Sequence, residues 1–154
     1  MSQQIYENKF KTSLLQFLDE LIEQYPTYPS IVIVRIFIKD KITAKTAIST
    51  FVEKVLPYYT LIQKKNDVLF TDLDVIYTSC FGAANKKDVE NLKTIWTGSD
   101  DDNKKAIWRW IDFFTVLSTK YHKKFMNHLK LESKQEKIED RKSTRLNSSH
   151  QIIS

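Results

Sequence analysis

The sequence predicts an all-α protein, folded as a single compact domain of about five to seven helices with a long C-terminal helix. Two observations lead to this prediction. Apolar residues recur at three- and four-residue spacing through much of the 154-residue chain, which is the pattern of amphipathic helices. The chain also has only two glycines and three prolines, too few for the many turns of an all-β fold.

The first predicted helix runs from about Ile5 to Gln24, with its apolar residues on one face and polar residues on the other. The motif YPTYP ends it, because a proline disfavours helix in the residue before it.

The stretch from Ile31 to Ile38 is ambiguous. Seven of its eight residues are apolar and several are β-branched, which favours a strand. No second strand of matching strength exists to pair with it, and a strand without a partner leaves buried backbone groups unsatisfied. The same composition suits a helix that is buried on every side. Helix is favoured over strand, and both alternatives remain open.

The next predicted helix is Thr43 to Leu56, and Pro57 can stand in the first turn of a helical piece that follows it. Residues 66–84 have a weaker pattern, which indicates one or two short helices or irregular turns. Lys87 to Trp96 is predicted as a short helix.

The last predicted helix begins after Gly98, where Ser99 or one of Asp100, Asp101 and Asp102 can cap its N-terminus. Its apolar stripe runs from Ile107 to Leu129. We expect the core of the protein to contain the following residues: Phe10, Leu14, Phe17, Leu21, Ile48, Phe51, Val55, Trp96, Ile107, Trp110, Ile111, Phe114 and Tyr121.

The final segment, DRKSTRLNSSHQIIS at 140–154, has no aromatic residue and no hydrophobic face. It resembles the translation of a sequencing-library adapter, which matches eleven consecutive residues from Asp140 to His150. We therefore expect 140–154 to be a non-native, disordered tail that makes no packed contact, and the true C-terminus to lie beyond Glu139. The domain organisation is then a helical domain at 1–131 and a charged, solvated extension at 132–139.

Composition limits the function classes. Without the three basic residues and one acidic residue of 140–154, the net charge falls from +5 to +3, too small to indicate nucleic-acid binding by itself. The single Cys80 cannot form an internal disulfide, so nothing indicates an oxidising compartment. No run resembles a signal peptide or a transmembrane helix, and a soluble intracellular protein is expected.

No catalytic, cofactor-binding or metal site is predicted. Asp72 and Asp74 form an Asp-x-Asp pair outside any Rossmann-like context, so turn and cap roles are favoured. His122 and His128 are six residues apart, not the four that would hold zinc on one helix face. Nucleic-acid binding or enzymatic activity remains the alternative, through Cys80 or through the basic side of the last helix. That basic side comprises Lys120, Lys123, Lys124 and Lys130.

A candidate interaction surface lies off the core stripe of the last helix. Trp108 points about 100° away from Ile107, on the side of Asp112 and Met126. Either another element covers Trp108, or Trp108 is an exposed anchor for a protein partner, since tryptophan is common at binding hot spots. In the second case Trp108 and Met126 flank a groove, with Arg109 and Lys123 at its rim.

Three blocks carry a resemblance to a known group of proteins: FKTSLLQFLDELIEQYP, ISTFVEKVLPYYTLIQKKNDVLF and AIWRWIDFFTVLSTKYHKK. Together they are similar to small helical proteins of unassigned function from nucleocytoplasmic large DNA viruses of the mimivirus and phycodnavirus kind. The resemblance implies a junction at Val55 to Tyr58 and a location in the host cytoplasm or virus factory. It implies no catalytic residues. A non-catalytic protein-interaction module with an unidentified protein partner is the expected function.

Overall fold

The computed structural model describes residues 2–83 and 85–134. Within these residues the fold is all-α, as predicted, with seven α-helices and no strand. The elements are α1 (Gln3–Gln24), α2 (Pro29–Lys41), α3 (Ala44–Lys54), the 3-10 turn η1 (Leu56–Tyr58), α4 (Tyr59–Gln63), α5 (Val68–Thr71), the π-helical turn η2 (Ile76–Cys80), α6 (Lys86–Thr97) and α7 (Asp101–Phe125). The predicted tail at 140–154 and most of the extension at 132–139 lie outside the described residues.

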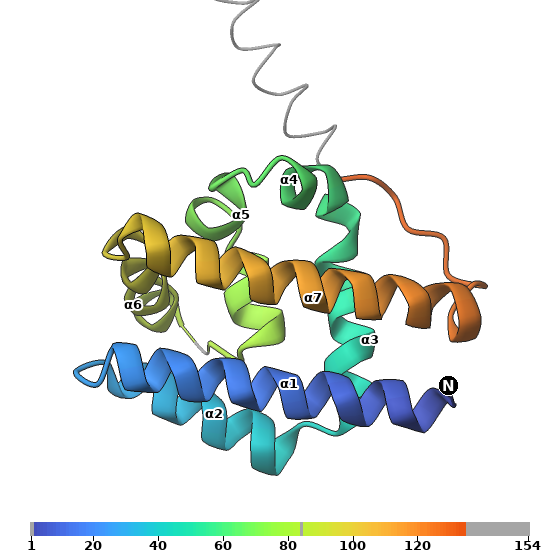
Figure 1. Ribbon diagram of the computed structural model, residues 1–154, viewed down its shortest axis with the longest axis horizontal. Helices are drawn as coiled ribbons and strands as arrows, with labels where there is room; N and C mark the ends of the chain where they lie inside the picture. Colours follow the sequence, from blue (N-terminus) through green and yellow to red (C-terminus); the bar gives the residue numbers. More distant parts are fainter. Residues whose placement is uncertain (1, 84, 135–154) are drawn as a thin grey trace, which may run out of the picture.

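Helices α1 and α7 lie side by side and antiparallel (Figure 1). Side-chain hydrogen bonds join them at both ends. The Tyr121 hydroxyl donates to Glu7 at 2.6 Å near one end, and Trp110 Nε1 donates to Glu20 at 2.7 Å towards the other. Helix α3 packs against both of them, and Phe51 from α3 meets Phe10 and Phe114 with ring centroids 5.5 and 6.2 Å away.

Four of the helices begin with a side-chain cap, which satisfies a backbone N–H that the helix itself leaves unbonded. The capping residues are Ser2, Thr43, Asn85 and Asp100. The Asp100 carboxylate accepts from the Asn103 N–H at 2.8 Å, so the predicted acidic cap of the last helix is confirmed. Of these four caps, only the one at the start of α7 was predicted from the sequence.

The ambiguous stretch at 31–38 is helical, as favoured, and forms the middle of α2. It is not buried on every side, so that part of the prediction is wrong. Only Ile31, Val34 and Ile38 are buried. The reason lies in its neighbours: α2 packs against α1 and α6, and these cover one side of the helix.

The last helix is shorter than the sequence pattern predicts, because it ends at Phe125 and not near Leu129. Beyond it the chain folds back, and His122 Nε2 is hydrogen-bonded to the Leu129 carbonyl at 2.7 Å. The Lys134 N–H then donates to the Pro57 carbonyl at 3.1 Å. Leu129 continues the apolar stripe in sequence but reaches the core from a turn, which periodicity alone cannot distinguish from helix.

The predicted core is confirmed in most of its members. Of its thirteen residues, only Leu21 and Trp110 are half-buried, and both of these pack against the core. No helix in the described part of the chain is both long enough and apolar enough to cross a membrane.

Candidate functional site

Trp108 is buried, with only 6% of its surface exposed. Its ring lies edge-on to Trp96 and Phe70, at centroid distances of 5.8 and 4.9 Å. Lys65 Nζ lies over the ring, 5.5 Å from its centroid. The structure therefore supports the covered alternative for Trp108, and an exposed anchor at this position does not agree with it.

The other four residues of the predicted surface do not form one groove with Trp108. Asp112 pairs with Lys65 at 2.6 Å and lines, with Lys123, a groove beside α4. Arg109 lines a different groove on the α1 side of α7. Met126 is half-buried against the core. Arg109 and Lys123 are exposed, and a role for them in partner binding stays a prediction.

Cys80 has the wrong protonation state for a nucleophile. Burial raises the pKa of its thiol to about 12, although the nearby positive charge of Lys54 acts in the opposite direction. The thiolate is the reactive form of cysteine, so a thiol with this pKa is almost fully protonated and reacts slowly at neutral pH. The lysines of the predicted basic side are exposed, and Lys124 Nζ lies 5.3 Å from the centroid of the Tyr6 ring.

The acidic residues have structural roles. Asp72 ends α5, and Asp74 pairs with Lys93 of α6 at 2.5 Å. The described residues contain no group of three or more His, Cys, Asp and Glu side chains that could hold a metal ion.

An apolar surface that was not predicted from the sequence lies on α2. Val32, Ile33, Ile36 and Phe37, here called the α2 outward face, are 42%, 65%, 53% and 38% exposed. They are neighbours on one side of the helix, since residues three and four apart share a face. The sequence does indicate this exposed face, because residues 31–38 contain more apolar side chains than the single buried stripe of a surface helix can account for.

The chain after η2 lies against one edge of this face. Gly82 has a φ of +66°, a conformation that side chains other than glycine rarely adopt. A Cβ atom at Gly82 would lie 2.5 Å from Phe37 Cε1. The backbone conformation therefore favours glycine at this position, and any larger residue would also displace the Phe37 ring.

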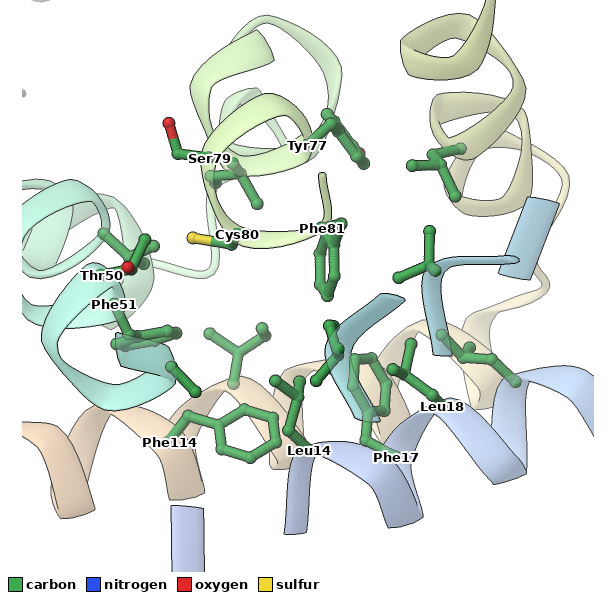
Figure 2. Close-up of a pocket in the computed structure, with 18 of the residues that line it drawn as sticks. Leu14, Phe17, Leu18, Thr50, Phe51, Tyr77, Ser79, Cys80, Phe81 and Phe114 are labelled. Atoms are coloured by element: carbon green, nitrogen blue, oxygen red, sulfur yellow. The ribbon is translucent and has the colours of Figure 1, made fainter. Parts of the chain in front are cut away.

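A cavity of about 140 Å³ lies between α1, α2, α3, α5, η2, α6 and α7 (Figure 2). Leu14, Phe17 and Leu18 of α1 and Phe114 of α7 form one wall, and the Phe81 ring projects towards it from the opposite side. The exposed residues Thr46 and Ser79 also line the cavity, so it reaches the surface between α3 and η2.

The few polar groups around this cavity are neutral. The Tyr77 hydroxyl donates to the Phe70 carbonyl at 2.6 Å, and burial raises the pKa of this tyrosine, with the charge of Asp74 adding to the effect. The Cys80 sulfur points towards the side where Thr50 lies (Figure 2). A cavity with such walls can hold an apolar group but offers no charged partner to an ionic one.

Comparisons with known protein families, with curated proteins and with solved structures found no match. Within the described residues, the α2 outward face and the cavity are therefore the candidate sites. Neither feature contains an acid, base or nucleophile suited to catalysis.

Proposed function

We propose that this protein is a non-catalytic protein-interaction module that binds its partner through the α2 outward face. The observation that supports the proposal is the exposure of four adjacent large apolar side chains on one helix, led by Ile33 at 65%. Single exposed apolar residues are ordinary, but contiguous patches mark interaction surfaces.

The composition of α2 adds to this argument. Between Ile31 and Ile38 the helix has one charged residue, Arg35, and this residue forms an ion pair with Asp19 of α1. The α2 outward face therefore contains no charge of its own over two turns of helix. Hydration of such a surface is unfavourable, at about 25 cal/mol for each Å² of apolar area, so covering it stabilises a complex.

The partner that best fits this face is a second copy of the chain. In a two-fold symmetric interface the same patch serves both subunits, so the pattern must be self-complementary. The apolar positions 32, 33, 36 and 37 are symmetric about the point between Val34 and Arg35. Two antiparallel α2 helices would therefore place Ile33 of each copy against Ile36 of the other.

The ends of α2 agree with this antiparallel arrangement. Asp40 is exposed and lies one turn beyond Ile36. In the symmetric pair its carboxylate would face the first turn of α2 in the second copy, near Pro29. The N-terminal end of a helix has a partial positive charge, which stabilises a carboxylate placed there.

The interface would be small. A single helix of 13 residues offers less than the roughly 800 Å² per partner found in stable complexes. We therefore expect reversible pairing, with a dissociation constant on the order of micromolar to millimolar.

Sedimentation equilibrium from about 1 μM to about 1 mM tests the proposal, because this range spans the expected affinity. The wild-type chain should shift from monomer to dimer as its concentration rises, and Ile33→Lys should remain monomeric. Val116→Lys is the matched control, because Val116 is 55% exposed on α7 and away from the α2 outward face. It should pair like the wild type.

Two results would overturn the proposal: a wild-type chain that stays monomeric throughout, or an Ile33→Lys variant that pairs as well as Val116→Lys. The resemblance to proteins of large DNA viruses extends the proposal to the origin of the chain. On this proposal the protein is viral, and its pairing takes place in the host cytoplasm or virus factory. The sequence of the gene together with its genomic neighbours tests that source.

A further inference from the structure

The cavity between the helices is a second candidate binding site, and the argument for it does not depend on the α2 outward face. Its volume is about 140 Å³. Protein interiors are packed as densely as organic crystals, and voids larger than a water molecule are few. A cavity of this volume is therefore a distinct feature of the core.

The size of the cavity limits what it can hold. An engineered apolar cavity of roughly 150 Å³, lined by leucine, isoleucine and phenylalanine, stays dry and binds benzene. The present cavity is similar in volume, and its walls include Leu14, Phe17, Ile31 and Phe114. A group of about six to eight non-hydrogen atoms therefore fits.

The walls also determine the charge of the ligand. The Tyr77 hydroxyl is already bonded to the Phe70 carbonyl, so it presents its ring and not a free donor. The hydroxyls of Thr46 and Ser79 lie where the cavity reaches the surface. An ion inside would lose its hydration without gaining a charged partner, since no charged residue lines the cavity, and this strongly disfavours charged ligands.

The local backbone gives independent support. One wall of the cavity comes from η2, whose residues Ile76, Tyr77, Ser79 and Cys80 form a π-helical turn. Such turns are rare and occur frequently at functional sites. Phe81 follows this turn, and its ring projects into the cavity (Figure 2).

We propose that this cavity binds a neutral apolar molecule of the size of a small aromatic or branched hydrocarbon. Such a ligand fills the space between η2 and the inward side chains of α1, α2 and α3. Its atoms lie against the Cys80 side chain, which lines the cavity.

Benzene is the probe, and pyrimidine, a polar ring of the same shape, is the ligand control. Saturating benzene should raise the thermal midpoint of the wild-type chain by a few degrees, because it binds the folded state only. Cys80 is the only cysteine, so its slow modification by methyl methanethiolsulfonate, measured at alkaline pH where more of the thiol is ionised, reports on this cavity alone. Benzene should slow that reaction severalfold, and pyrimidine should have no effect on either measurement.

A pair of variants on α3 tests the location. Ala47 lines the cavity, so Ala47→Leu should fill it and abolish both effects of benzene. Ala44 does not line the cavity, and Ala44→Leu should respond like the wild type. Equal responses to benzene and pyrimidine, no response in the wild type, or an unchanged response in Ala47→Leu would each overturn the proposal. If Ala47→Leu does not fold, the protection of Cys80 in the wild type still decides between the two ligands.

Discussion

Helices α2 and α7 are both rich in apolar residues, yet they relate to the rest of the protein in different ways. In α7 the apolar residues form a stripe, and the stripe is buried: Ile107, Ile111 and Phe114 are all at most 7% exposed. In α2 apolar residues surround the helix, and burial divides them, with Ile31 at 1% and Ile33 at 65%. Composition makes a residue suitable for burial, but the neighbouring elements determine whether it is buried.

The two helices also differ in how many elements cover them. Helix α7 contacts α1, α3, α4 and η1, and the Trp108 ring lies against Phe70 and Trp96 as well. Helix α2 lies at the edge of the molecule (Figure 1), where it packs against α1 and α6. Helix α7 therefore buries Trp108 outside its main stripe, although Phe113 and Val116 remain exposed, whereas α2 leaves four neighbouring apolar side chains exposed.

The largest expected effect concerns the covered side of α7. Trp108→Ala should lower the free energy of unfolding by about 3–5 kcal/mol, because it removes a buried indole from contact with Trp96 and Phe70. Urea denaturation measures the change. Arg109→Ala is the control, since Arg109 is exposed and its truncation should cost about 0.5 kcal/mol or less. Equal losses in the two variants would show that Trp108 is not covered in solution.

Long helices could be predicted from the sequence, whereas short elements and the end of α7 could not. Helices α1, α3, α6 and α7 are long enough to show helical periodicity, and all four were predicted from the sequence. The elements α5 and η2 have four and five residues, too few to establish a period. The end of α7 was misplaced because Leu129 continues its stripe from outside the helix.

The candidate sites were harder to predict than the helices. The α2 outward face required knowing which elements cover α2, and the cavity depends on how side chains from seven elements fill the space between them. Neither property is encoded in one stretch of sequence. Trp108 was correctly placed off the main stripe, but its burial depends on Phe70 and Trp96, which lie on other elements.

The next largest effect is the difference in stability loss between substitutions on the buried and the exposed side of α2. Ile31→Ala should lower the free energy of unfolding by about 2–5 kcal/mol, because Ile31 is buried. Ile33→Ala should change it by about 0.5 kcal/mol or less in dilute, monomeric protein, since that side chain is exposed. Chemical denaturation at low micromolar concentration separates the two. A large loss for Ile33→Ala under these conditions would mean that the α2 outward face is covered within the monomer.

The smallest expected effect concerns the ion pair beside Trp108. Lys65 Nζ lies 2.6 Å from Asp112 Oδ2 and also over the Trp108 ring, but both charged side chains are more than 40% exposed. Water and salt screen such a pair, so Asp112→Asn should cost about 0–1 kcal/mol. A double-mutant cycle with Lys65→Met isolates the coupling between the two charges, because methionine keeps an apolar stem near the ring. The coupling energy should decrease further as the salt concentration rises. A coupling of several kcal/mol that is insensitive to salt would show that Lys65 and Asp112 are shielded from water. The edge of α7 near Trp108 would then be part of the core, and the contrast with the exposed face of α2 would be sharper than the structure shows.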